Sequence, residues 1–146
     1  MRADVDLTQW QALAKSTSIP LAGGENIYGC ANFIAFAKSG LRYLQPDVAK
    51  WGGVSGAMEL ARSLPAGAKL WPHFMGTAVG QMAALCVTAA ASPHAVCEMD
   101  VNDNRLRTEL CGDILVVENG KVLLPINPGL VTPPLDEQLQ AFCDGP

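Results

Sequence analysis

The sequence predicts an α/β fold with parallel strands, and three observations support this prediction. Short apolar segments alternate with longer amphipathic ones, as in chains built from βα units. Glycine, proline or polar residues separate these segments. Hydrophobic residues make up 49% of the 146 residues and charged residues 16%, which excludes a disordered chain and a coiled coil. By its length the chain is expected to form one domain, residues 1–146.

The expected elements follow from the spacing of apolar residues and from the residues that end each run. The expected helices are Leu7–Lys15, Ala31–Lys38, Ser55–Leu64 with Ser55 as its N-cap, and Ala78–Ala90. The expected strands are Ile19–Ala22, Tyr43–Gln45, Lys69–Trp71 and Ala95–Met99. The longest apolar stretch, Met82–Ala91, is interrupted by Thr88 and is interpreted as part of a buried helix.

The chain changes character after Asp100. The segments Ile114–Glu118 and Lys121–Leu124 flank Asn119 and Gly120, a pair that favours the type I′ turn of a β-hairpin. A proline-rich irregular segment follows, and a short helix is expected over Asp136–Phe142.

Composition excludes several classes of partner. The net charge is −4 and no basic stripe is present, so nucleic acid is not expected to bind. No run of eighteen apolar residues is present, so no membrane span is expected. The first residues lack the apolar segment of a signal peptide, so we expect a cytoplasmic protein with reduced cysteines. Without CxxC spacing, the cysteines are interpreted as small buried hydrophobes: Cys30, Cys86, Cys97, Cys111 and Cys143.

The most informative pattern lies where the four expected strands end, because an ionisable residue lies at or just after the end of each of them. These residues are Glu25, Asp47, His73 and Glu98. In βα-barrels, side chains at the C-terminal ends of strands converge on the face that holds the active site. Buried strand ends also require a partner or a metal for such groups. The pattern therefore indicates a site without naming its reaction.

Five segments, in order and spacing, carry a family resemblance: IPLAGGENIYG (19–29), LQPDVAKWGG (44–53), PHFMGTAVG (72–80), CEMDVNDNRLRTEL (97–110) and NGKVLLPINPGL (119–130). Together they resemble the mandelate racemase and muconate lactonizing enzyme group of the enolase superfamily. The resemblance implies part of a TIM-type (β/α)7β barrel, about strands 5 to 8 with their helices, followed by the hairpin and the short helix.

The resemblance also implies a reaction and roles for the strand-end residues. Members bind a carboxylate substrate through a divalent metal, normally Mg2+, remove the proton next to the carboxylate and stabilise an enediolate. Glu25 matches the fifth-strand metal ligand, and magnesium prefers such hard oxygen ligands. Asp47 and His73 match an acid–base dyad in which the aspartate fixes the histidine tautomer. Glu98 matches the eighth-strand acid, which can donate a hydrogen bond to the enediolate when protonated.

The dyad favours the mandelate racemase subgroup, whose members are hydroxy-acid racemases and acid-sugar dehydratases. Muconate-type cycloisomerases use a sixth-strand lysine, and Lys50 is given no such role. The capping domain, the first four strands and two of three metal ligands have no counterpart here. The chain is therefore expected to be a fragment, an inactive remnant, or a structural half that binds a missing half or forms a homo-oligomer.

Each candidate also has an ordinary structural interpretation. Glu25 can stabilise a helix N-terminus, Asp47 can be a turn residue, His73 a core histidine and Glu98 a solvated loop acid. His94 is expected at the surface, and Arg105 and Arg107 are expected to form salt bridges to barrel loops rather than bind an acidic substrate.

Overall fold

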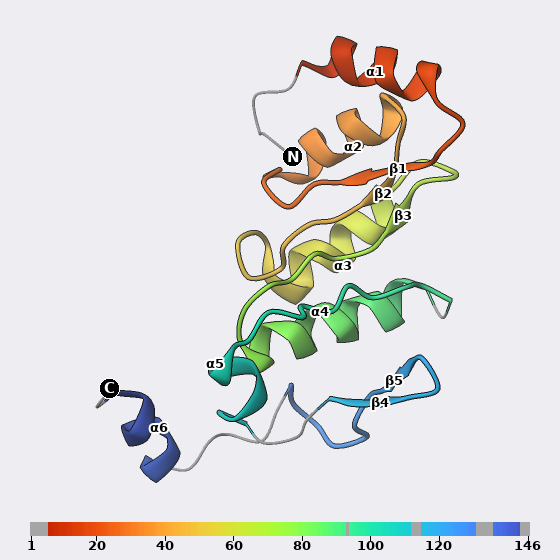
Figure 1. Ribbon diagram of the computed structural model, residues 1–146. Coiled ribbons are helices and arrows are strands. Elements are labelled where there is room, and N and C mark those ends of the chain that lie inside the picture. Colours follow the sequence, from red (N-terminus) through yellow and green to blue (C-terminus); the bar gives the residue numbers. More distant parts are fainter. Residues whose placement is uncertain (1–5, 93, 112–114, 131–135, 144–146) are drawn as a thin grey trace.

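The computed structural model describes residues 6–92, 94–111, 115–130 and 136–143. It contains a three-stranded parallel sheet in the upper half of the view in Figure 1. The strands are β1 (Leu21–Gly23), β2 (Leu41–Leu44) and β3 (Lys69–Leu70), in the spatial order β1-β2-β3. Leu44 pairs with Gly23 on one side and with Leu70 on the other. The parallel pairing confirms the predicted α/β class.

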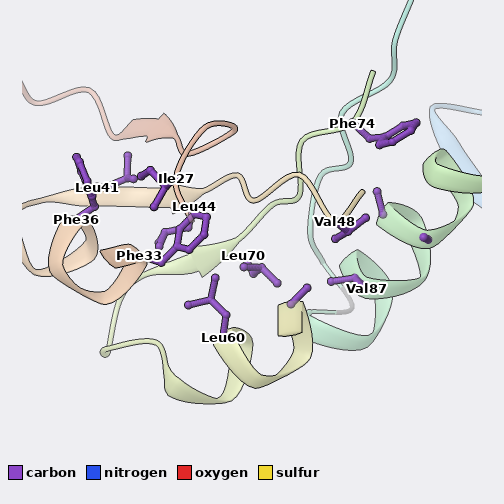
Figure 2. Close-up of a cluster of buried hydrophobic side chains, with 13 residues drawn as sticks. Ile27, Phe33, Phe36, Leu41, Leu44, Val48, Leu60, Leu70, Phe74 and Val87 are labelled. Carbon is purple, nitrogen blue, oxygen red and sulfur yellow. The ribbon is translucent and has the colours of Figure 1, made fainter. Parts of the chain in front are cut away.

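Helices connect the strands and cover one face of the sheet. Helix α2 (Cys30–Lys38) joins β1 to β2, and α3 (Gly53–Ser63) joins β2 to β3. The core brings together residues from α2, the strands, α3 and α4 (Ala78–Ala91), among them Phe33, Phe36, Leu44, Leu60, Leu70 and Val87 (Figure 2). Helix α1 (Leu7–Ser16) lies against α2, where Trp10 meets Phe36 edge-on with ring centroids 6.1 Å apart.

The opposite face of the sheet stays partly open. Ala22, Tyr43 and Lys69 are register partners and therefore share this face. Ala22 and Lys69 are exposed, and Tyr43 stacks on Trp71 with ring centroids 3.8 Å apart. Parallel sheets are normally covered on both faces, whereas the described residues cover this face only in part.

Helix α4 confirms the buried helix predicted for the apolar stretch. Thr77 caps it by accepting a hydrogen bond from the backbone N–H of Gly80. A Cβ atom at Gly80 would collide with the ring of Phe74, so this glycine permits close packing. No helix in the described part of the chain is long and apolar enough to cross a membrane.

The region after α4 contains small, separate elements. They are the helix α5 (Arg105–Thr108), the hairpin strands β4 (Val116–Glu118) and β5 (Lys121–Leu123), and α6 (Asp136–Cys143). The predicted turn is confirmed, because Asn119 and Gly120 both have positive φ angles, 51° and 72°. The predicted start of the hairpin at Ile114 lies outside the described residues.

Two predictions about elements are wrong. Ala95–Met99 is not a strand, because no strand of the described residues pairs with it and an extended segment needs a hydrogen-bonded neighbour to become one. Ser55 is not an N-cap, since α3 begins at Gly53 after Gly52, whose φ is 74°. The other strand boundaries shift by one or two residues. The five cysteines are free as expected, but the prediction that they are buried is wrong, because four are partly exposed and Cys143 is exposed.

Candidate active site

Backbone pairing beyond the ends of the three strands positions the predicted site residues. Trp71 N donates to Leu44 O (2.8 Å) and His73 N donates to Pro46 O (3.1 Å), so the β2–β3 ladder continues past both strands. An isolated parallel bridge pairs Asp47 with His73. This pairing brings both residues to the carboxyl edge of the sheet, as the sequence predicts.

Glu25 reaches the same edge through a tight turn after β1. Gly24 has a φ of 132°, and a Cβ there would lie 3.0 Å from the ring of Phe33 and 3.1 Å from Gln45 N. Glycine therefore lets the chain pass close to β2 before it turns. The Oε1 atom of Glu25 accepts a hydrogen bond from Asn26 Nδ2 (3.1 Å).

The imidazole of His73 lies between two glutamates. Its Nδ1 is 2.8 Å from Glu98 Oε2, and its Nε2 is 3.2 Å from Glu25 Oε2. The His73 side chain is 10% exposed, whereas those of Glu25 and Glu98 are 36% and 38% exposed. A neutral ring donates from one nitrogen and accepts at the other, while a protonated ring donates from both. The ring can therefore gain or lose a proton while both of its nitrogens stay within hydrogen-bond distance of a glutamate oxygen.

Asp47 lies next to His73 in the ladder, yet its carboxylate contacts its own loop. Oδ1 accepts from the backbone N–H groups of Ala49 (2.9 Å) and Lys50 (3.2 Å), and Oδ2 is 3.3 Å from Lys50 Nζ. Among the described side chains, the partners of the His73 ring are the two glutamates. The arrangement brings Glu25, His73 and Glu98 together. The Asp47 carboxylate instead binds the backbone of its own loop, as expected for a turn residue.

Two glutamines near the site were missed by sequence reasoning. Gln45 Nε2 lies 3.4 Å from Glu98 Oε2, and Gln81 Nε2 donates to Glu98 O (3.1 Å). Gln45 precedes Asp47 by two residues, so strand periodicity could have placed it on the same face. Gln81 is a lone amide in an apolar helix, which is a weaker signal.

Glu25 is the type of ligand that magnesium prefers, but the described side chains supply too few such ligands to hold the ion. Glu25 offers carboxylate oxygens, the ligand type that magnesium prefers. Within residues 6–92, 94–111, 115–130 and 136–143, no group of three or more His, Cys, Asp or Glu side chains is placed to hold a metal ion. These residues therefore do not complete a magnesium site by themselves.

The two arginines after Glu98 form salt bridges, as expected, but with acids of their own segment and not with barrel loops. Arg107 Nη1 is 2.7 Å from Asp100 Oδ2, with both side chains largely buried, and Arg105 Nε is 2.9 Å from Glu109 Oε2 at the surface. The backbone N–H of Asn102 above all, and also Arg107, lower the pKa of Asp100. These arginines stabilise the segment that follows Glu98, and His94 is exposed as predicted.

Comparison with known proteins identifies the family of this chain. The family model described as "Enolase C-terminal domain-like" matches residues 1–137. The chain belongs to this family. The resemblance to the mandelate racemase and muconate lactonizing enzyme group is thereby confirmed, and solved structures support it. A mandelate racemase/muconate lactonizing enzyme from Bordetella bronchiseptica is 40% identical with a TM-score of 0.83, over 97% of this chain and 40% of that chain.

Other enolase-family relatives are named for acid-sugar chemistry. The 3,6-anhydro-D-galactonate cycloisomerase of Zobellia galactanivorans is 27% identical with a TM-score of 0.83, over 94% of this chain and 39% of its own. D-galactarolactone cycloisomerase of Agrobacterium fabrum is 34% identical over 77% of this chain, and arabinonate dehydratase of Saccharolobus solfataricus 29% over 81%. The chain spans about a third, 32%, of each of these two curated relatives.

Proposed function

We propose that this chain forms part of a lyase or isomerase that removes the proton next to the carboxylate of an acid sugar or hydroxy acid. The observation that carries the proposal is His73, held between Glu25 and Glu98 where parallel strands end. The cycloisomerase and dehydratase relatives support this reaction class. The proposed place of residues 1–146 is the C-terminal part of a barrel domain, about strands 5 to 8.

His73 is the proposed acid–base group. A neutral ring nitrogen takes the proton from the α-carbon, and the electron pair of the broken C–H bond moves into the carboxylate to give an enediolate. Glu98, when protonated, donates a hydrogen bond to the enediolate oxygen. Asp47 is the proposed partner that fixes the His73 tautomer, which requires its carboxylate to leave Lys50.

Glu25 is the proposed magnesium ligand of this chain. A bound magnesium ion would stabilise the negative charge of the substrate carboxylate and of the enediolate. The ion would have to take further ligands from substrate or from other segments, because the described side chains offer no group of three. The experiment below therefore compares the reaction with and without added magnesium.

Exchange of the α-proton with solvent tests the proposal. The folded chain is incubated in D2O with arabinonate or D-galactarolactone, with and without Mg2+, and NMR measures deuterium at the α-carbon. We expect exchange above the buffer rate, lost in His73→Asn and retained in His94→Asn, which changes the other, exposed histidine. Folded protein that gives no exchange with either substrate contradicts an autonomous site.

The alternative proposal is a structural half or inactive remnant, and two observations favour it. The described residues lack a complete metal site, and β1 and β3 each pair only with β2, beside a partly open sheet face. Unpaired edges of this kind favour association. Analytical ultracentrifugation tests it: association predicts a mass above the 15.4 kDa of a monomer, and a monomer that shows α-proton exchange contradicts it.

A further inference from the structure

The segment that carries Glu98 belongs to no strand of the described residues, so its position depends on other contacts. Its backbone carbonyl accepts a hydrogen bond from Gln81 Nε2 at 3.1 Å. Gln81 lies in the first half of α4, seventeen residues before Glu98, and only 1% of its surface is exposed. In a paired strand, the Glu98 carbonyl would accept a hydrogen bond from the backbone N–H of a neighbouring strand. Here it accepts one from the side-chain amide of Gln81.

The surroundings of Gln81 indicate that its hydrogen bond to Glu98 is the reason for an amide side chain at this position. Its Oε1 atom is buried and has no hydrogen-bond partner among the described residues. The neighbours Met82, Ala83 and Ala84 are apolar and buried. A methionine would fill similar space without burying an unpaired oxygen, so the amide is explained by what its Nε2 holds.

Helix α4 also connects Gln81 to His73. Thr77, four residues after His73, caps the helix, and Gln81 N donates to Thr77 O (3.0 Å) in its first turn. One rigid helix therefore begins just after the His73 loop and holds the Glu98 backbone. The 2.8 Å contact of His73 Nδ1 with Glu98 Oε2 therefore joins two segments whose relative position is set by α4.

We propose that Gln81 is a positioning residue that keeps Glu98 within reach of the His73 ring. Gln45 contributes from the strand side through its contact with Glu98 Oε2, whereas Gln81 binds the Glu98 backbone carbonyl. The catalytic meaning of this role rests on the proposed function, in which Glu98 faces the enediolate. The geometric role does not depend on activity.

The ¹⁵N spectrum of the two histidine side chains tests the proposal without a substrate. Glu98→Gln sets the reference change of the His73 Nδ1 signal, and exposed His94 is the internal standard. We expect Gln81→Met to shift the His73 signal in the same direction as Glu98→Gln and to leave His94 unchanged. The matched control is Thr88→Val, which removes another buried hydrogen bond of α4, from Thr88 Oγ1 to Ala84 O (2.7 Å), and should not shift His73.

A folded Gln81→Met chain whose His73 signal matches that of Thr88→Val overturns the proposal. If the methionine variant does not fold, Gln81→Asn replaces it, because a shorter amide keeps the polarity and cannot reach the Glu98 carbonyl. If Gln81→Met leaves the His73 signal unshifted while the wild type exchanges the α-proton, Gln81 has no positioning role and the proposed function stands. If Gln81→Met shifts the His73 signal but the wild type shows no α-proton exchange, the positioning role stands and the proposed function fails.

Discussion

The sheet with its helices and the region after α4 are built differently, and the candidate site spans both. Residues 21–88 contain the buried side chains of the core, from Ile27 to Val87. After Thr88 no described residue is buried as a whole, although polar side chains such as those of Asp100 and Arg107 are largely shielded from solvent. Glu25, Asp47 and His73 therefore belong to a framework fixed by packing and backbone pairing. Glu98 belongs to a segment that a few polar contacts hold, which makes it the part of the site most easily displaced.

The largest expected effect is loss of stability from a change in the packed region. Phe33 is 0% exposed and Ile126 is 100% exposed. Phe33→Ala should lower the free energy of unfolding by about 3–5 kcal/mol, and Ile126→Ala should change it by no more than about 0.5 kcal/mol. Urea denaturation measures both, and similar effects at the two sites would contradict the division into two regions.

Glycine substitutions in two helices should have opposite signs. A methyl group at Gly80 would collide with Phe74, so Gly80→Ala should cost about 1–3 kcal/mol of stability by overpacking. A methyl group at Gly56 in α3 meets only Trp51 at 3.9 Å, so Gly56→Ala should stabilise by about 0.5–1 kcal/mol. Thermal unfolding measures both variants, and a stabilising Gly80→Ala would show that α4 is less closely packed.

Asp100 should make the region after α4 sensitive to acid. Its pKa is lowered in the folded chain, so the stabilisation is present above the unfolded pKa and disappears as pH falls through the folded value. The stability difference between the wild type and Asp100→Asn should be largest at neutral pH and shrink below about pH 4. Denaturation at several pH values measures it, and a difference that grows toward acid would reverse the sign of the argument.

The smallest effect concerns cysteine reactivity within the less packed region. Burial raises the pKa of the Cys111 thiol, whereas Cys143 is exposed. A higher pKa leaves less thiolate at mildly alkaline pH, so Cys111 should react more slowly with iodoacetamide than Cys143. Mass spectrometry of the modified peptides gives the two rates, and equal rates would mean that Cys111 is accessible.

Sequence patterns predicted the packed region better than the segment around Glu98. Apolar periodicity located the three strands, and Asn119–Gly120 identified the hairpin, because both signals act over a few residues. The strand predicted over Ala95–Met99 failed because its apolar pattern does not reveal whether a neighbouring strand is present.

Contacts between distant segments were equally invisible to the sequence. The Gln81 hydrogen bond to Glu98 crosses seventeen residues, and no local rule identifies its acceptor. Strand ends pointed to Glu25, Asp47 and His73 as candidates, but they did not reveal which side chains contact one another. Asp47 contacts Lys50, and the two glutamates contact His73 instead.

The most direct test of the site is which carboxylate each nitrogen of the His73 ring contacts. In ¹⁵N spectra of the histidine side chains, Glu25→Gln should shift chiefly the Nε2 signal of His73 and Glu98→Gln chiefly its Nδ1 signal. In the substrate-free chain, Asp47→Asn should shift neither by a comparable amount, because its carboxylate contacts Lys50. A His73 ring that responds to Asp47→Asn and ignores both glutamate variants would contradict the arrangement described above.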